Sequence, residues 1–367
     1  MDQQANGSRG DRRDARRLRN GLVWTAVLAV LLLGVGLAIP DLRGVLDRAS
    51  RANLAWLGLA VALEVASCLG YVGTVRLVLA RGPAKMVRRL AWAEMAFGAV
   101  VPVGGAGGLA VGAWAMRTWG ISWSRIANRS AVIFFLTSAV NIAVLGLAGV
   151  GLLAGVDNTH ASFVYGLVPA VVAFAGLAVC IALPPLIGDR EPSADSNALT
   201  GALSRAASWI RDTENVAFTP NWRLLGTVGY LLFDIAVLWA CLRALGVNAP
   251  IVALVLGYQI GYLANLVPIP GGLGVLEGGL LGALLLYGLP AAPTAAAVVL
   301  YHAIALWVPT LGGTLGFARL RGSLATQRSR LAQEKSDPTE VAAERPQLPA
   351  GPEHLPAPPP KDRHLAA

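Results

Sequence analysis

Long apolar runs are the feature that most constrains this chain. A helix needs about 20 predominantly apolar residues to cross a bilayer, and six stretches reach roughly that length. Hydrophobic residues make up 55% of the 367 residues and charged residues only 14%, whereas a soluble domain has about 25% charged residues. The sequence therefore predicts an all-α polytopic membrane protein. The expected spans are residues 21–39, 54–80, 126–153, 163–187, 224–245 and 292–317.

The two ends of the chain are polar. Residues 1–20 are basic and are predicted to be disordered. The apolar stretch after them is longer than a signal-peptide core, so we expect a retained anchor helix. From residue 320 the chain is polar and then rich in proline, which is typical of a disordered tail. The expected domains are residues 1–20, a membrane domain at 21–319 and a tail at 320–367.

The pattern Pro-x-x-Gly-x-x-Gly interrupts two further apolar segments. Proline cannot donate the helical hydrogen bond, and clustered glycine weakens a helix further. Each segment is therefore predicted to form two half-helices joined by irregular backbone, as a re-entrant hairpin. Such backbone is tolerated at membrane depth only where protein buries it or where it lines a cavity. The pattern residues are Pro102, Gly105 and Gly108, and Pro268, Gly271 and Gly274.

The two breaks lie 166 residues apart, and this offset also relates their neighbours. It carries the span at 54–80 onto residues 220–246 and the span at 126–153 onto residues 292–319. Three consecutive elements that match at one offset indicate a duplication. The repeat halves are residues 54–153 and 222–318.

Arginine and lysine residues predict the orientation of the spans. The basic N-terminus, the cluster at 81–89, the loop at 188–223 and the tail fall on one side, which the positive-inside rule makes cytoplasmic. Both termini are then cytoplasmic, in a bacterial inner membrane. The two hairpins enter from opposite faces, so the repeats are inverted, a recurrent design in transporters. The exceptions to the rule are Arg43, Arg48, Arg51 and Arg243.

Several short stretches resemble the flippase-like membrane domain of bacterial lysylphosphatidylglycerol synthases, over roughly residues 20–320. In the second half these are Asn265–Glu277, Gly288, Leu300–His302 and Leu306–Pro309. In the first half they are Pro102, Gly105, Gly108 and Trp119–Ser122.

The resemblance implies movement of a lipid with a polar headgroup between leaflets. The substrates usually proposed are aminoacylated phosphatidylglycerol and polyprenyl-phosphate-linked glycans. Two departures leave the substrate open: His302 stands where many relatives have arginine, and Phe134–Leu136 occupies the region of a Glu-Arg pair. The aminoacyl-transferase domain of the full-length synthases is absent from the sequence, so we expect no enzyme activity.

Ionisable residues inside spans are costly and are candidate functional residues. Glu64 and Asp234 lie within spans, and each could instead pair with an arginine or bond a neighbouring helix. Glu94 precedes the first break and could equally be an interfacial residue. Glu277 follows the second break, where a carboxylate also suits a helix N-terminus. We expect Glu277 to face the cavity and to bind a cationic headgroup or exchange a proton.

Half-helix N-termini present free N–H groups that suit a lipid phosphate, and the four break glycines would let the backbone approach it. Close packing by small residues is the alternative role for these glycines. Asn265, Tyr301 and His302 complete the predicted substrate-binding set. For His302 alone, a structural role is the more common one.

No metal, cofactor or nucleic-acid site is expected, because the histidines and cysteines lack ligand spacing and the arginines flank apolar runs. Membrane lipids are the expected partners. Self-association and a partner of the Pro-rich tail stay open. Two other functions also stay open, an intramembrane transferase acting on a lipid headgroup and a non-transporting scaffold.

Overall fold

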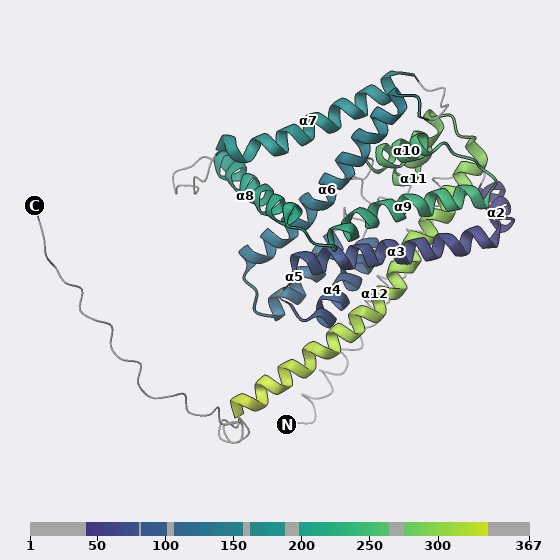
Figure 1. Ribbon diagram of the computed structural model, residues 1–367. Coiled ribbons are helices and arrows are strands. Elements are labelled where there is room, and N and C mark those ends of the chain that lie inside the picture. The colour runs from purple at the N-terminus through teal and green to yellow at the C-terminus, as the bar shows by residue number, and fades with distance from the viewer. Residues whose placement is uncertain are drawn as a thin grey trace, which may run out of the picture. The chain divides into compact units, whose positions relative to one another are not determined.

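The computed structural model describes residues 42–80, 82–100, 106–156, 162–187, 198–263 and 275–336. At residues 42, 43, 45, 46, 106, 198, 275–277 and 323–336 only the backbone is described. All regular secondary structure in this part of the chain is α-helical (Figure 1). The helices are α2 (Leu42–Ser50), α3 (Leu54–Val78), α4 (Ala84–Val100), α5 (Ala106–Thr118), α6 (Trp123–Leu153), α7 (Val164–Ile187), α8 (Ala198–Phe218), α9 (Leu224–Ala244), α10 (Ile251–Leu263), α11 (Val275–Leu286) and α12 (Ala291–Ser336).

Five of the described helices are long and apolar enough to cross a membrane, namely α3, α6, α7, α9 and α12 as far as Gly322. They match five of the six predicted spans to within a few residues, and the sixth, at 21–39, lies outside the described residues. Large apolar side chains point outward on these helices, as on α7 at Val171, Val172 and Phe174. Such a surface is suited to lipid rather than water. The prediction of an all-α, multi-pass membrane protein is confirmed.

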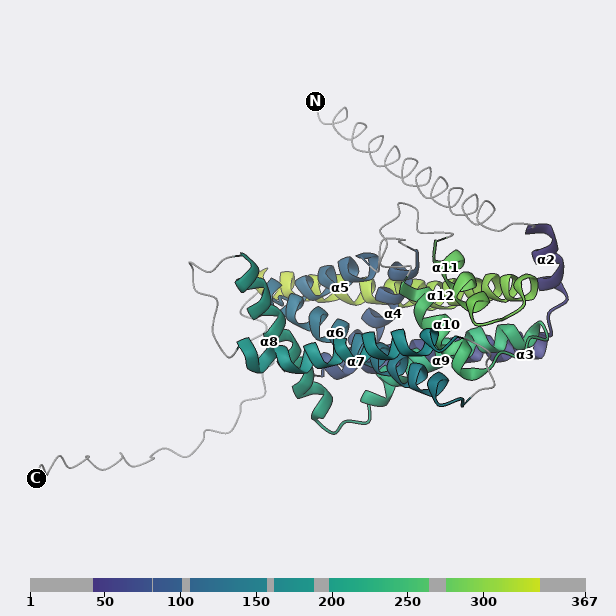
Figure 2. The ribbon, with the colours of Figure 1, turned by 90° about the horizontal axis from the view of Figure 1, so that it is seen from above.

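Four shorter helices form two pairs. Helices α4 and α5 have 17 and 13 residues and pack against each other (Figure 2). Helices α10 and α11 have 13 and 12 residues and do the same. Helices of this size reach about 18–26 Å, which is short of a hydrocarbon core of about 30 Å. The connections between the two helices of each pair, at residues 101–105 and 264–274, lie outside the described residues. The first break was predicted to extend to Gly108, but α5 begins at Ala106, so Gly108 is helical.

The predicted repeat extends over four consecutive helices. Moving the first residues of α3, α4, α5 and α6 by 166 positions gives 220, 250, 272 and 289. The helices α9, α10, α11 and α12 begin at 224, 251, 275 and 291. The two halves therefore share the order long helix, short pair, long helix. We call α4–α5 the first hairpin and α10–α11 the second hairpin.

Helices α3 and α9 are repeat equivalents, and they pack against each other along their length (Figure 1). At one end the backbone N–H of Asn53 donates to the carbonyl of Ala244 at 2.9 Å. Near the other end the hydroxyls of Thr74 and Thr227 lie 3.0 Å apart. The two helices are thus antiparallel, which is the relation expected between equivalent helices of an inverted repeat.

Glycine brings the backbones of α3 and α9 together. A Cβ built at Gly70 would lie 2.6 Å from the carbonyl oxygen of Gly226, and one at Gly226 would lie 2.8 Å from the oxygen of Gly70. The same device joins α6 to α7, where a Cβ at Gly149 would lie 2.8 Å from the oxygen of Gly166. Because lipid supplies no hydrophobic driving force between helices, close packing of small residues holds them together.

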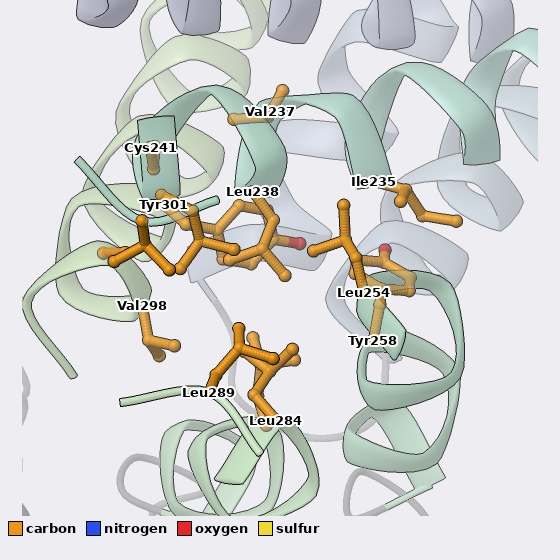
Figure 3. Close-up of a cluster of buried hydrophobic side chains, with 14 of the residues drawn as sticks. Ile235, Val237, Leu238, Cys241, Leu254, Tyr258, Leu284, Leu289, Val298 and Tyr301 are labelled. Carbon is orange, nitrogen blue, oxygen red and sulfur yellow. The ribbon is translucent and has the colours of Figure 1, made fainter. Parts of the chain in front are cut away.

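The main cluster of buried apolar side chains lies in the second half of the molecule. Its members come from α9, α10, α11 and α12, with Ala60 from α3. Figure 3 shows Leu238 of α9, Leu284 of α11 and Val298 of α12 turned toward one another. Tyr258, Tyr287 and Tyr301 belong to the same cluster, so it brings three hydroxyl groups into an apolar interior.

The segment between α7 and α9 contains the helix α8, which extends from Ala198 to Phe218. It packs on α6 and α7 rather than standing alone. The amide of Asn128 donates to Asp212 at 2.9 Å, and Arg211 donates to the carbonyl of Pro184 at 3.3 Å. The helices up to Leu320 form one compact unit, which contains every contact described below.

Candidate functional site

Asp234, near the middle of α9, accepts hydrogen bonds from tyrosines of two other helices. The hydroxyl of Tyr301 on α12 lies 3.1 Å from Oδ2 and 3.2 Å from Oδ1. The hydroxyl of Tyr258 on α10 also donates to Oδ2. Tyr262 follows one turn later on α10, with its hydroxyl 3.5 Å from that of Tyr301. The second hairpin and the last span therefore converge on this one carboxyl group.

Glu64 of α3 lies beside Asp234 and is only 5% exposed. The thiol of Cys68 donates to its Oε1 at 3.6 Å, and its Oε2 is buried with no hydrogen-bond partner among the described residues. The carboxyls of Glu64 and Asp234 are close enough to interact electrostatically. We call these two residues the acid pair.

The acid pair is part of a repeat-related group of four side chains. The offset of 166 carries Glu64 onto Tyr230 and Cys68 onto Asp234. The four side chains are neighbours in space, so a charge on one acts on the others. Because α3 and α9 are antiparallel, Glu64 of α3 lies opposite Asp234 of α9, and Cys68 lies opposite Tyr230. The group thus lies where the two repeats cross.

Helical spacing explains how the sequence builds this group. Glu64 and Cys68 are four residues apart, as are Tyr230 and Asp234, so each pair lies on one helix face. The hydroxyl of Ser67 donates to the carbonyl of Tyr230 at 2.8 Å and holds the two faces in register. In the described part of the chain no lysine or arginine contacts the acid pair, so the predicted alternative of an arginine partner does not apply there.

Glu94 of α4 lies inside the first hairpin and not at the acid pair. The hydroxyl of Tyr71 on α3 donates to its Oε2 at 3.2 Å. A Cβ built at Gly112 of α5 would lie 2.2 Å from its Oε1, so that glycine makes room for the carboxylate. A Cβ at Gly108 would lie 2.6 Å from the Glu94 carbonyl oxygen. Gly108 therefore has the close-packing role, against the backbone of α4.

Most of the residues predicted to form the two breaks lie outside the described ranges. Helix α11 begins at Val275, so the backbone of Glu277 lies in its first turn, but its side chain is outside the description. His302 follows Tyr301 on α12, with the two rings edge-on and 5.4 Å apart. The break residues outside the described ranges are Pro102, Gly105, Asn265, Pro268, Gly271 and Gly274.

The sequence analysis missed the tyrosines around the acid pair. Tyr258 and Tyr262 are four residues apart on α10 and stack with ring centroids 4.8 Å apart. That spacing is visible in the sequence, as is the repeat relation of Glu64 to Tyr230. Neither signal says which helix the hydroxyls face, and that depends on how the helices pack. In the described residues no group of three or more His, Cys, Asp or Glu side chains could hold a metal ion.

Comparison with known proteins agrees with a multi-pass membrane protein. A UPF0104 membrane protein of Methanothermobacter thermautotrophicus is 37% identical to this chain over 90 residues, which is 24% of this chain and 26% of that protein. The matched stretch thus spans about a quarter of the relative's length. The family model described as the lysylphosphatidylglycerol synthase TM region matches residues 22–313, which confirms the resemblance. The chain belongs to the family of the lysylphosphatidylglycerol synthase TM region.

Proposed function

We propose that this membrane protein moves a lipid with a polar headgroup between the two leaflets of a bacterial inner membrane. The observation that carries this proposal is the acid pair, Glu64 and Asp234, at the crossing of two antiparallel repeat-equivalent helices. Transporters built from inverted repeats bind substrate at the repeat interface near the bilayer midplane. The membership of the family and the two short-helix pairs support the same function.

The chemistry of the acid pair favours a headgroup that carries a cation. Buried carboxylates are costly unless a positive charge or hydrogen bonds compensate them. Tyrosine hydroxyls supply hydrogen bonds to Asp234, whereas Oε2 of Glu64 has no hydrogen-bond partner among the described residues. An amine, as in an aminoacylated phosphatidylglycerol, would provide the missing charge. A purely anionic glycan lipid would be repelled unless a proton or a metal cation came with it.

We infer a transporter rather than an enzyme. The group around the acid pair consists of carboxyls, tyrosines and one thiol inside the spans. These groups suit reversible binding of a cation through charge and hydrogen bonds. Both termini are proposed to lie in the cytoplasm.

Reconstitution of the full chain into liposomes tests this function. Fluorescent lysyl-phosphatidylglycerol and a fluorescent polyprenyl-phosphate sugar would be followed by reduction of the label in the outer leaflet. We expect protein-dependent exchange of the lysyl lipid, and at least a tenfold loss with Asp234→Asn, on the order expected for losing one buried charge contact. Cys180→Ala on α7 is the control. Leaflet exchange that is the same with and without protein for both lipids would refute the proposal.

A further inference from the structure

The arginines that are exceptions to the positive-inside rule lie near one end of the α3–α9 pair. Arg43 and Arg48 belong to α2, and Arg51 follows it directly. Two residues later the N–H of Asn53 donates to the carbonyl of Ala244, at 2.9 Å, and the neighbour of Ala244 is Arg243. Residues far apart in the sequence thus meet at the end of the α3–α9 pair. The side chain of Arg43 is outside the description, so the site below uses the other three.

Arg243 stacks on Trp56, which in turn packs against a second tryptophan. Its guanidinium carbon lies 5.3 Å from the ring centroid of Trp56, and that ring meets Trp239 edge-on at 5.2 Å. A guanidinium stacked on a ring keeps its N–H groups in the plane of the fork, where phosphate oxygens bind. Tryptophan also prefers the depth of lipid headgroups. The two indoles and the guanidinium therefore form a combination suited to the level of a lipid phosphate.

Positive charge remains at this end after the local ion pair is taken into account. Asp47 pairs with Arg51 at 2.8 Å, and both side chains are mostly exposed. Arg48 contacts the carbonyl of Gly44 at 3.4 Å, a neutral partner. The loops at 245–250 and 287–290 contain no charged residue. The N-terminus of α3 adds a positive dipole end, of which Asn53 caps only one N–H, that of Ala55.

We propose that Arg48, Arg51 and Arg243 form a docking site for the phosphate of an anionic phospholipid in the leaflet at this end of the bundle. Arginines on the side that the positive-inside rule disfavours need a compensating role, and a bound anionic headgroup provides one. Trp56 and Trp239 provide the apolar floor on which the glycerol and upper acyl chains rest. The site does not depend on lipid transport, since a resident lipid would occupy it as well.

A local probe of lipid composition tests the site. Ser50→Cys, exposed at the end of α2, would carry a fluorophore in a Cys180→Ala background, because Cys68 and Cys241 are buried. The full chain would be placed in phosphatidylcholine nanodiscs that hold equal mole fractions of spin-labelled phosphatidylglycerol or spin-labelled phosphatidylcholine. We expect stronger quenching by the phosphatidylglycerol. The preference should fall by about fivefold for each arginine changed to glutamine, as expected for interfacial arginines.

Matched variants separate this site from general charge effects. Lys85→Gln, Arg88→Gln and Arg125→Gln together remove the same charge at the opposite end and should leave the preference unchanged. Arg48→Gln with Arg51→Gln changes only exposed side chains, so we expect folding to be preserved while the preference falls for both changes together. Equal quenching by the two lipids in the parent protein would overturn the proposal. Relief of quenching by inorganic phosphate at constant ionic strength would overturn it in favour of free phosphate.

Discussion

In both hairpins a pair of glycines brings the two helices into contact, but the pair lies on the second helix of the first hairpin and on the first helix of the second. In the first hairpin Gly108 and Gly112 lie four residues apart on the second helix, and in the second hairpin Gly257 and Gly261 do so on the first helix. A Cβ at Gly261 would lie 2.5 Å from the Cα of Leu280, as close as the contact of Gly108 with α4. Small residues at this spacing let backbones touch. Neither hairpin has room for a side chain at its closest point.

What faces these glycines differs. Gly112 faces the carboxylate of Glu94, whereas Gly257 faces the side chain of Leu284. The first hairpin thus holds an acid between its own helices. The second hairpin is apolar inside and directs Tyr258 outward to Asp234. The first repeat therefore has its buried carboxyl between the two helices of its hairpin. The second has its buried carboxyl between the hairpin and the neighbouring helix α9.

The hairpins also differ in how they are held. The second is bonded to α6 by Gln259, whose amide donates to the carbonyl of Asn141 at 3.2 Å, and to α7 by Tyr287, whose hydroxyl donates to Tyr165 at 3.0 Å. The first is bonded to α3 by Tyr71 and to α12 by Arg89, whose guanidinium donates to the carbonyl of Arg319 at 3.4 Å. Glycine brings it close to α12, since a Cβ at Gly313 would lie 2.3 Å from a backbone oxygen of α4. With the main apolar cluster in the second half, we expect the second hairpin to be the more resistant to opening.

The largest effect is expected from Gly261→Ala. The new methyl would meet the backbone of Leu280, which cannot move without separating α10 from α11. We expect a loss of about 3 kcal/mol or more in stability, at the upper end for overpacking, and little folded protein. Size-exclusion chromatography after a heating series would measure it. Gly282→Ala on α11 is the control, because a Cβ there meets nothing within 4 Å. Equal melting of the two variants would contradict the close contact.

A smaller effect is expected from Gly112→Ala in the first hairpin. The methyl would meet the end of the Glu94 side chain, which can rotate away, so we expect a loss of about 1–2 kcal/mol. Combining it with Glu94→Ala removes the clashing atoms. The double variant should then be more stable than the sum of the single effects by about 1 kcal/mol. Strictly additive effects in the same melting assay would show that Gly112 does not accommodate Glu94.

Tyr301→Phe and Tyr71→Phe compare the two acids directly. Each removes one hydroxyl that donates to a carboxyl, to Asp234 in one case and Glu94 in the other. Tyr301 is 1% exposed, so its loss should cost about 1–2 kcal/mol, and the loss of Tyr71 about half of that. Thermal melting of the purified variants would rank them. The reverse order would mean that the first hairpin, and not the second, depends more on its acid.

The smallest effect is expected from Arg243→Gln, which removes the stacking on Trp56 at the end of the α3–α9 pair. An exposed cation–π contact contributes about 0.5–1 kcal/mol, so the melting temperature should hardly change. Trp56→Leu should cost more, because the ring also packs against Trp239. A large loss with Arg243→Gln would assign this arginine a role in folding rather than in lipid binding.

Most of the fold could be predicted from the sequence because the membrane makes hydropathy a local signal. A span is recognised by its own residues, since lipid requires each helix to satisfy its backbone within itself. The bounds of α3, α6, α7 and α9 follow from this. The repeat offset found at Pro102 and Pro268 also relates the starts of four helices.

The candidate site could be predicted only in part. Glu64 and Asp234 stood out by the sequence alone, because a carboxyl in an apolar span is conspicuous whatever surrounds it. That they form one pair, with Tyr258 and Tyr301 as hydrogen-bond donors rather than an arginine, depends on the antiparallel packing of α3 on α9. Glu94 was also found, but the tertiary structure assigns it to the inside of the first hairpin.

By itself the sequence determined the class of protein, its spans, its duplication and which acids lie in the membrane, because each of these depends on neighbours along one helix. Only the tertiary structure decided which side chains meet. Glycines such as Gly70 and Gly226 set how closely two helices cross, and this distance selects the residues at the crossing. A contact between residues 64 and 234 is a property of two helices together, so a pattern along either one does not contain it.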